Sequence, residues 1–308
     1  MSVQPLKKEN KANHVVVTNK VKPETTDSQV DDNFEISFWN KFKRNKIAVI
    51  CGAYLILIVF CAVFAPFLTT YSPTQGELAS RILPIGSEGH FLGTDEQGRD
   101  MWTRIIFGAR LSLLAAFVPV LIGTMIGSIL GIVSGYFGGR IETLIMRNLD
   151  IYYAFPAIIL AIALAAVIGS GLGTIIISLS FIMIPPISRV AMSATKKVAH
   201  MEYIDAAKTS GAGHVKIMYY HIFPNVFSPI FVYASTLLGL SLLFASGLSF
   251  LGLGVEPPIA EWGFMLNSLK DLVIISPMIT FTPGFFIFIT ALALNLFSDG
   301  IRDAMQEK

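Results

Sequence analysis

Charged residues are scarce in this chain. Asp, Glu, Lys and Arg make up 14% of its 308 residues, whereas hydrophobic residues make up 53%. A typical soluble domain carries about 25% charged residues. So few charges cannot cover the surface of a soluble protein of this length, which excludes an ordinary soluble fold. The net charge of +2 is too small to indicate a nucleic-acid partner.

Motifs for catalysis and metal binding are missing as well. The two cysteines have no C-x-x-C spacing, and the five histidines form no cluster with ligand spacing. The sequence contains neither H-E-x-x-H nor the phosphate-binding pattern G-x-x-x-x-G-K-[ST]. We therefore predict no catalytic residue, cofactor or metal site, and no ATP hydrolysis by this chain itself. A G-x-G-x-G run at Gly169, Gly171 and Gly173 lies between two apolar blocks and predicts a turn.

The hydrophobic residues fall into blocks of about 20, the length of helix that crosses roughly 30 Å of hydrocarbon. Barrel strands would instead alternate over about 10 residues. The sequence therefore predicts an all-α integral membrane protein. We predict six transmembrane helices, over residues 47–68, 111–135, 145–168, 174–194, 226–250 and 278–297.

Three regions follow from the same pattern. Residues 1–35 are polar and predict a disordered tail, and residues 36–46 predict an amphipathic segment on the membrane surface. Residues 47–308 form the predicted membrane domain. With a cytoplasmic N-terminus, 18 Lys and Arg residues fall on the inner side and 5 on the outer side. The positive-inside rule therefore predicts that both termini are cytoplasmic.

Glycine and proline mark special positions within the spans. A stripe of glycines every four residues lets a neighbouring helix approach closely, and proline kinks or breaks a helix. We predict close packing at Gly123, Gly127, Gly131 and Gly135, and kinks at Pro119, Pro156, Pro185 and Pro186. Ionisable groups inside the spans are rare, which argues against a proton-coupled secondary transporter. For Asp150 we predict an ion pair with Arg147, one helical turn away.

The segment between the fourth and fifth spans reads EYIDAAKTSGAGHVKIMYYHIFPN from Glu202. Good helix formers predict a helix over 203–210. Gly211 and Gly213 allow a sharp turn, and a second amphipathic helix follows. Pro224 is expected to end that helix and open the fifth span. The pattern alone leaves two interpretations open: a simple connecting loop, or a rigid unit that passes movement from a soluble partner into the bundle.

This segment resembles the EAA loop of ABC importer permeases, E-A-A-x-x-x-G, nine residues, then I-x-L-P. Here Asp205, Ala206 and Ala207 precede Gly211 by the same spacing, and the segment ends on HIFP at Pro224. Asp replaces Glu, His replaces Ile and Phe replaces Leu. The stretches at 92–113, 134–156, 248–266 and 298–305 resemble further motifs of one branch. The chain is similar to the oligopeptide/dipeptide-type ABC importer permease family, C-type subunit, over about 40–305.

The resemblance implies an ABC type I importer permease bundle in a bacterial inner membrane, importing di- or oligopeptides. It implies a second, different permease subunit, two ATPase subunits that carry ATP and Mg, an extracytoplasmic substrate-binding protein, and membrane lipid around the bundle. A metal importer for nickel or a metal–chelator complex remains an alternative, and a secondary transporter is a weaker one. The coupling loop spans about 200–224. Its ATPase-coupling residues are expected to be Glu202, Tyr203, Asp205, Ala206, Ala207, Gly211, Ala212 and Pro224.

Two further features lie on the predicted outer side. A charged run is expected either to contact the binding protein or to pair internally and hold its loop on the second span, and we favour internal pairing. Its residues are Asp95, Glu96, Arg99, Asp100, Arg104 and Arg110. The loop 255–277, which contains two prolines and Trp262, is expected to form a re-entrant or surface hairpin.

Overall fold

The computed structural model describes residues 38–305. The predicted tail over 1–35 lies outside this range, and so does the start of the predicted surface segment 36–46. Residues 38–44 are helical, and this helix ends before Asn45. The Asn45 side chain accepts a hydrogen bond from the backbone N–H of Ala48 (3.1 Å), so it caps the first long helix.

Helices dominate the described residues. The long ones are α2 (Lys46–Val63), α4 (Met101–Phe137), α7 (Leu172–Ala199), α10 (Phe223–Phe250) and α12 (Pro277–Met305). Shorter ones are α3 (Ala65–Leu68), α5 (Gly139–Tyr153), α6 (Ala157–Ile168), α8 (Glu202–Thr209), α9 (His214–Ile217) and α11 (Trp262–Leu269). Single turns lie at η1 (Leu78–Ser80), η2 (Met218–Ile222) and η3 (Lys270–Leu272). Within this range, five helices are long and apolar enough to cross a membrane, or six if one bent pair counts as a span.

The bent pair is α5 and α6, over the predicted span 145–168, in which we expected a kink or break at Pro156. The two helices meet at 85°. Pro156 lies in the break and has no N–H to donate, and it disfavours helical backbone at Phe155. The break expected at Pro156 is therefore confirmed, and the predicted span consists of two helices. With 12 residues, α6 is about 18 Å long and too short to span hydrocarbon alone.

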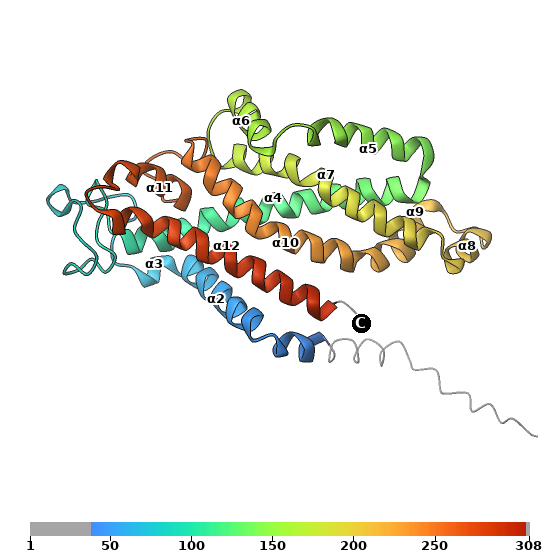
Figure 1. Ribbon diagram of the computed structural model, residues 1–308, viewed down its shortest axis with the longest axis horizontal. Coiled ribbons are helices and arrows are strands. Elements are labelled where there is room, and N and C mark those ends of the chain that lie inside the picture. The colour runs from blue at the N-terminus through green and yellow to red at the C-terminus, as the bar shows by residue number, and fades with distance from the viewer. Residues whose placement is uncertain (1–37, 306–308) are drawn as a thin grey trace, which may run out of the picture.

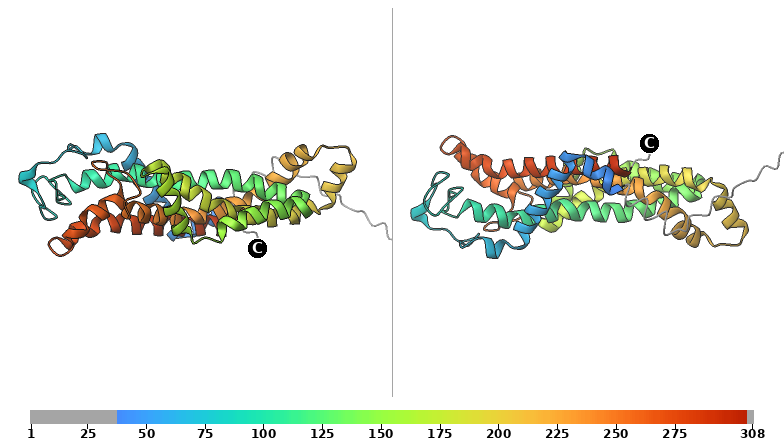
Figure 2. Two further views of the ribbon diagram at one scale, coloured as in Figure 1. Left: turned by 90° about the horizontal axis from the view of Figure 1, so that it is seen from above. Right: turned by 90° about the horizontal axis from the view of Figure 1, so that it is seen from below.

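The long helices lie side by side in an elongated bundle (Figures 1 and 2). α4 packs along α7, and α10 contacts both of them as well as α12. α2 packs against α12 and α4, while α5 and α6 lie against α7. One end of the molecule is formed by α8 and α9 (the α8 end). The opposite end is formed by residues 69–100 and α11 (the α11 end; Figure 1).

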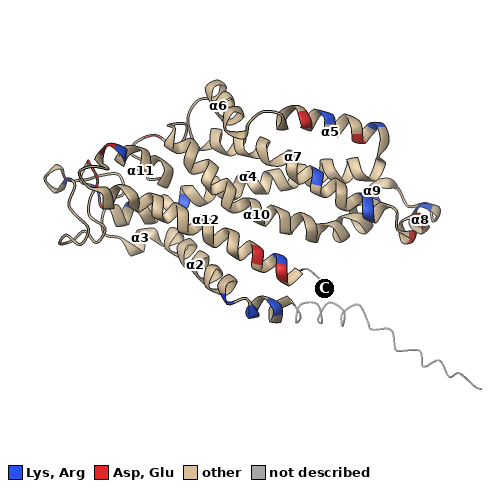
Figure 3. Cartoon of the chain, in the orientation of Figure 1, with Lys and Arg blue, Asp and Glu red and all other residues tan. Residues whose placement is uncertain are grey.

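Charges are distributed unevenly along this bundle. Figure 3 shows few charged residues along the middle of the long helices. Lys and Arg residues on α5, α7 and α8 lie toward the α8 end (Figure 3). An apolar middle with charged ends is the pattern expected of a bundle that crosses a bilayer.

The glycine stripe lies where α4 meets α7. A Cβ added at Gly123 would lie 2.7 Å from Met183 Cβ, and one at Gly135 would lie 2.7 Å from Met192 O. At Gly131 it would meet the backbone oxygen of Ser188 at a still shorter distance. At Gly127 the nearest atom, Ile184 O, is 3.0 Å away. Ordinary contacts between carbon atoms are about 3.5–4.0 Å, so α7 approaches the α4 backbone directly.

Candidate coupling site

The predicted helix, glycine turn and second helix are all present at the α8 end. Gly211 follows α8 with a φ of +81°, a left-handed conformation that costs other L-residues about 1–2 kcal/mol. The N–H of Ala212 donates to Ala207 O (3.1 Å), and the N–H of Gly211 donates to Lys208 O (3.0 Å). These two bonds form a Schellman motif, which satisfies the last carbonyls of the helix. The turn is therefore a defined structure that positions α8 relative to α9.

One face of α8 is buried. Ile204 is fully buried, as are Ile217 and Ile222 beyond the turn, and the three belong to one apolar cluster. Ala207 and Ala212 are half-buried and pack against the same cluster. This apolar contact, together with the Schellman hydrogen bonds, fixes α8 to the start of the following helix.

The other face of α8 is free among the described residues. It carries most of the predicted coupling side chains: Glu202, Tyr203, Asp205 and Ala206 are exposed. Asp205 pairs with Lys208 over 3.0 Å, and both side chains are exposed. Such a surface pair contributes little to stability. The helical backbone, and not this ion pair, therefore determines where the exposed side chains lie.

Pro224 does not separate the second helix from the fifth span, as we had expected. The chain stays helical from His214 to Phe250, with Pro224 in the first turn of α10. The turn before it, η2, is π-helical, and Phe223 N–H donates to Met218 O, five residues back. A π turn is wider than an α turn and accommodates the proline ring without a break. α9 and α10 are therefore parts of one continuous helix.

A second connection joins this unit to α4. The Tyr136 hydroxyl lies 2.8 Å from His214 Nδ1, and the Lys208 ammonium lies 6.0 Å from the centre of the Tyr136 ring. Tyr136 is in the last turn of α4, and His214 is the first residue of α9. Sequence reasoning missed this contact because 78 residues separate its partners, and no local signal relates them.

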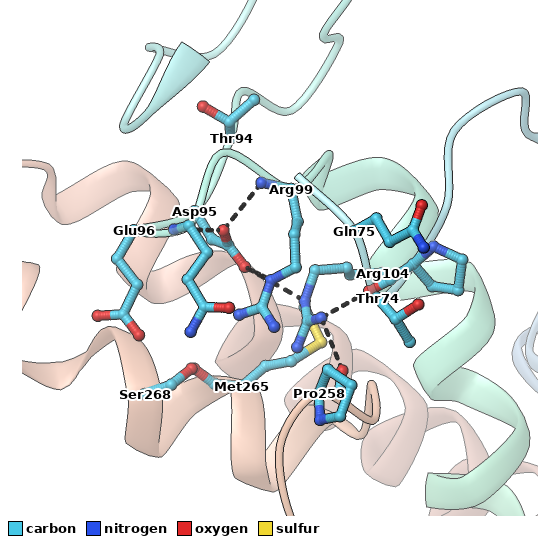
Figure 4. A network of polar contacts seen from close by, with 12 residues as sticks. Thr74, Gln75, Thr94, Asp95, Glu96, Arg99, Arg104, Pro258, Met265 and Ser268 are labelled. Atoms are coloured by element: carbon cyan, nitrogen blue, oxygen red, sulfur yellow. Dashed lines mark hydrogen bonds and ion pairs between the residues drawn. The ribbon is translucent and has the colours of Figure 1, made fainter. Parts of the chain in front are cut away.

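The charged run at the α11 end pairs internally in part, as the interpretation we favoured requires: Asp95, Arg99 and Arg104 pair with one another, Asp100 pairs with His90, and Arg110 donates to backbone carbonyls of α2. Asp95 Oδ2 lies 2.6 Å from Arg99 Nε and 3.4 Å from Arg104 Nε (Figure 4). Arg104 also donates to the carbonyls of Pro73 (2.7 Å) and Pro258 (3.2 Å). The three charged side chains are almost fully buried. Together they join the loop 69–100, the start of α4 and the segment before α11.

Neighbouring polar groups strengthen the same junction. Asp100 caps α4 by accepting from Thr103 N–H (2.8 Å). Glu261 caps α11 and accepts from Ser112 Oγ (3.0 Å). The buried Trp262 indole donates to Ile105 O (2.9 Å). The predicted hairpin over 255–277 is thus a short helix and a turn that bond to α4 through Glu261 and Trp262 and pack mainly against α10 and α12.

The ion pair predicted for Asp150 is wrong. Asp150 pairs with Arg189 of α7 at 2.7 Å, and the Arg189 guanidinium lies 4.4 Å from the centre of the Tyr153 ring. Seven residues further along α7, Lys196 pairs with Glu142 of α5 at 2.5 Å. These two pairs hold α5 along α7, and the local i,i+3 rule could not identify partners on another helix.

Comparison with known proteins identifies the family. The family model described as "Binding-protein-dependent transport system inner membrane component" matches residues 123–308. The chain belongs to this family. A second model, "N-terminal TM domain of oligopeptide transport permease C", matches residues 36–84 of the permease.

Curated relatives are similar over most of their length. The glutathione transport system permease protein GsiD of Pectobacterium atrosepticum is 39% identical over 88% of this chain and 90% of its own. The di/tripeptide transport system permease protein DppC of Pseudomonas aeruginosa is 38% identical over 88% of this chain and 91% of its own length. The dipeptide transport system permease protein DppC of Alkalihalophilus pseudofirmus is 36% identical over 93% of this chain and 95% of its own length.

A solved structure supports the fold of the permease. A chain of the MetNI methionine ABC transporter, in an inward-facing conformation, aligns with a TM-score of 0.52 at 16% identity. The match covers 67% of this chain and 98% of that chain. The permease is thus a multi-pass membrane protein with the fold of an ABC importer permease, and its predicted coupling residues gather in one unit at the α8 end.

Proposed function

We propose that this permease is one of two different membrane subunits of an ATP-driven importer for di- or oligopeptides. Two ATPase subunits, which hold ATP and Mg, dock on the coupling loops of the two permeases, one of them on the exposed face of α8 in this chain. An extracytoplasmic binding protein delivers the peptide at the α11 end. Both termini and the α8 end face the cytoplasm of a bacterial inner membrane. The observation that carries the proposal is the exposed α8 face on a helical unit that continues into α10.

The coupling mechanism follows from rigidity. An ATPase pair that closes on binding ATP moves α8 as a unit, because the Schellman turn and the cluster around Ile204 hold it to α9. The continuous helix from His214 to Phe250 passes this displacement along α10. The contact of Tyr136 with His214 passes it to α4, which packs tightly on α7. ATP bound to the ATPase subunits thereby changes which side of the membrane bundle is open.

Two independent observations support the orientation and the substrate class. The excess of Lys and Arg on the α8 side fits a cytoplasmic position. The named relatives transport dipeptides, tripeptides or glutathione, and glutathione is itself a tripeptide. Peptide import is therefore the substrate class to test first.

Gly211 provides the sharpest test of the coupling unit. A Cβ at Gly211 would meet no described atom within 4 Å, so only its φ of +81° is restrictive. Gly211→Val should abolish ATP-driven tri-alanine uptake into proteoliposomes that contain the complete complex. Gly211→Asn should retain most uptake, because asparagine tolerates left-handed backbone.

The matched control is Gly213→Val. Gly213 also has open space around its Cβ, but its φ of −67° suits any residue. This variant should transport normally, and all three variants should insert and pair with the second permease in a pull-down. Equal uptake by the Gly211→Val and wild-type complexes would show that the turn is not the coupling element. A complete complex that takes up no peptide at all would refute the peptide substrate.

A further inference from the structure

A cavity of about 610 Å³ opens between α7, α10 and α12, in the half of the bundle nearer the α8 end. Its floor is α10, from Ser228 to Thr236, and α7 contributes Val190. Asp299 and Arg302 of α12 form the opposite wall. Pockets that bind small molecules typically enclose 300–1,000 Å³, so this cavity has room for a short peptide.

The two charged groups of this wall are unpaired within residues 38–305. Neither Asp299 nor Arg302 lies within 4.0 Å of an oppositely charged side chain, and no side-chain hydrogen bond involves either in that range. In contrast, Arg189 and Lys196 on the neighbouring α7 have carboxylate partners. Among the described residues, Asp299 and Arg302 are therefore available to a ligand that carries both charges.

Their spacing matches the two ends of a peptide. Residues three apart on a helix have Cβ atoms about 5–6 Å apart on one face, and longer side chains widen this span. The ammonium and carboxylate groups of an extended dipeptide are roughly 7 Å apart. A guanidinium binds a carboxylate through two parallel hydrogen bonds, and a carboxylate accepts hydrogen bonds from an ammonium group.

The rest of the lining suits a peptide backbone. Ser228, Tyr233 and Thr236 bring hydroxyl groups to the cavity, while Val190 and Val232 supply apolar surface. Hydroxyls both donate and accept, so they serve the N–H and the C=O of a peptide bond whatever its side chains. Such a site recognises the termini and the backbone of a bound peptide and accepts peptides of many sequences.

We infer that this cavity is a binding subsite for a zwitterionic short peptide. Asp299 binds the peptide's ammonium terminus, and Arg302 binds its carboxylate terminus. The inference rests on the proposed peptide import and places the subsite on the release side of the membrane. A peptide leaving the bundle pauses there before it enters the cytoplasm.

The test measures binding to the complete complex in nanodiscs, without ATP and without the binding protein. The probe is radiolabelled Ala-Ala, with Ala-Ala amide and N-acetyl-Ala-Ala as competitors. Arg302→Gln should weaken Ala-Ala binding by about tenfold or more and remove the preference for Ala-Ala over its amide. Asp299→Asn should remove the preference for Ala-Ala over its N-acetyl form. Asp303→Asn is the matched control, because Asp303 lies on the same helix but not in the cavity lining, and it should bind like the wild type.

Uptake of tri-alanine by the same complexes separates the two ideas. If the wild-type complex imports peptide but both cavity variants keep wild-type binding and end-group preference, the subsite is refuted and the importer stands. An absence of saturable Ala-Ala binding to a complex that imports peptide has the same meaning. If the wild-type complex imports no peptide, both the function and the subsite fail. Loss of the amide preference in Arg302→Gln alone, with the N-acetyl preference intact, supports the assigned direction of the peptide.

Discussion

The contact between α4 and α7 gives a quantitative prediction at Gly131. In Gly131→Ala the new Cβ would lie 2.5 Å from Ala191 Cβ and 2.9 Å from Met192 N, in addition to its contact with Ser188 O. Two of these three atoms belong to the backbone and cannot rotate away. α7 must therefore move away from α4 by about 1 Å to restore the ordinary contact distance. Overpacking of this kind costs about 1–3 kcal/mol. Alanine recovers about 0.8–1 kcal/mol through its better helix propensity.

The net effect is a destabilisation of up to about 2 kcal/mol. For a chain of this size we expect the midpoint of thermal unfolding to fall by up to about 4–8 °C. The measurement is circular dichroism of the purified chain in one detergent. Gly127→Ala, whose nearest contacts are 3.0–3.1 Å, should cause a smaller decrease.

Gly247→Ala is the matched control. Gly247 lies within α10, and a Cβ there would meet no described atom within 4 Å. This variant should be as stable as the wild type or more stable, because only the propensity term remains. If Gly131→Ala unfolds at the same temperature as Gly247→Ala, the two helices do not approach as closely as the structure shows, and the reasoning from the glycine stripe fails.

Three further changes test other contacts. Asp95→Ala leaves two buried guanidinium groups without their carboxylate and should cost about 3–5 kcal/mol, seen as a lower unfolding midpoint, whereas Glu96→Ala on the same loop should change it little. Tyr136→Phe removes the hydrogen bond to His214, worth about 0.5–1.5 kcal/mol. It should lower peptide uptake per ATP hydrolysed, and an unchanged ratio would remove this contact from the coupling route. Glu261→Gln replaces a charged cap by a neutral one and should destabilise α11 by about 1 kcal/mol, measured as faster proteolysis of the loop before it.

The ends of the long helices show what hydropathy measures. The second predicted span covers 111–135, whereas α4 runs from Met101 to Phe137. Hydropathy delimits the apolar stretch, but a helix continues until a cap ends it. Here Asp100 caps the start of α4, and Gly138 with a φ of +63° follows its end. Both were visible in the sequence as single residues, but nothing local marked them as boundaries.

The helix α8 and the turn after it could be predicted from the sequence, but which face of α8 is exposed could not. Helix propensity and glycine predicted α8 and its turn, because both depend on the backbone preferences of neighbouring residues. The sequence placed Ala206 and Ala207 together as contact residues. In the structure Ala206 is exposed and Ala207 packs inward, because adjacent helical residues point about 100° apart. Which of them faces solvent depends on where α9 and α10 lie.

The sequence by itself determined that this chain crosses a membrane in about six helical segments, that a structured turn lies between the fourth and fifth, and which family it resembles. These properties follow from the transfer free energies of side chains and the φ preferences of single residues, which act locally. The tertiary structure alone decided that Asp150 pairs with Arg189, that Tyr136 contacts His214, and that Asp299 and Arg302 of α12 lie across a cavity from residues of α7 and α10. Each of these depends on the distance between groups in three dimensions, and packing sets that distance between segments that have no fixed relation along the chain.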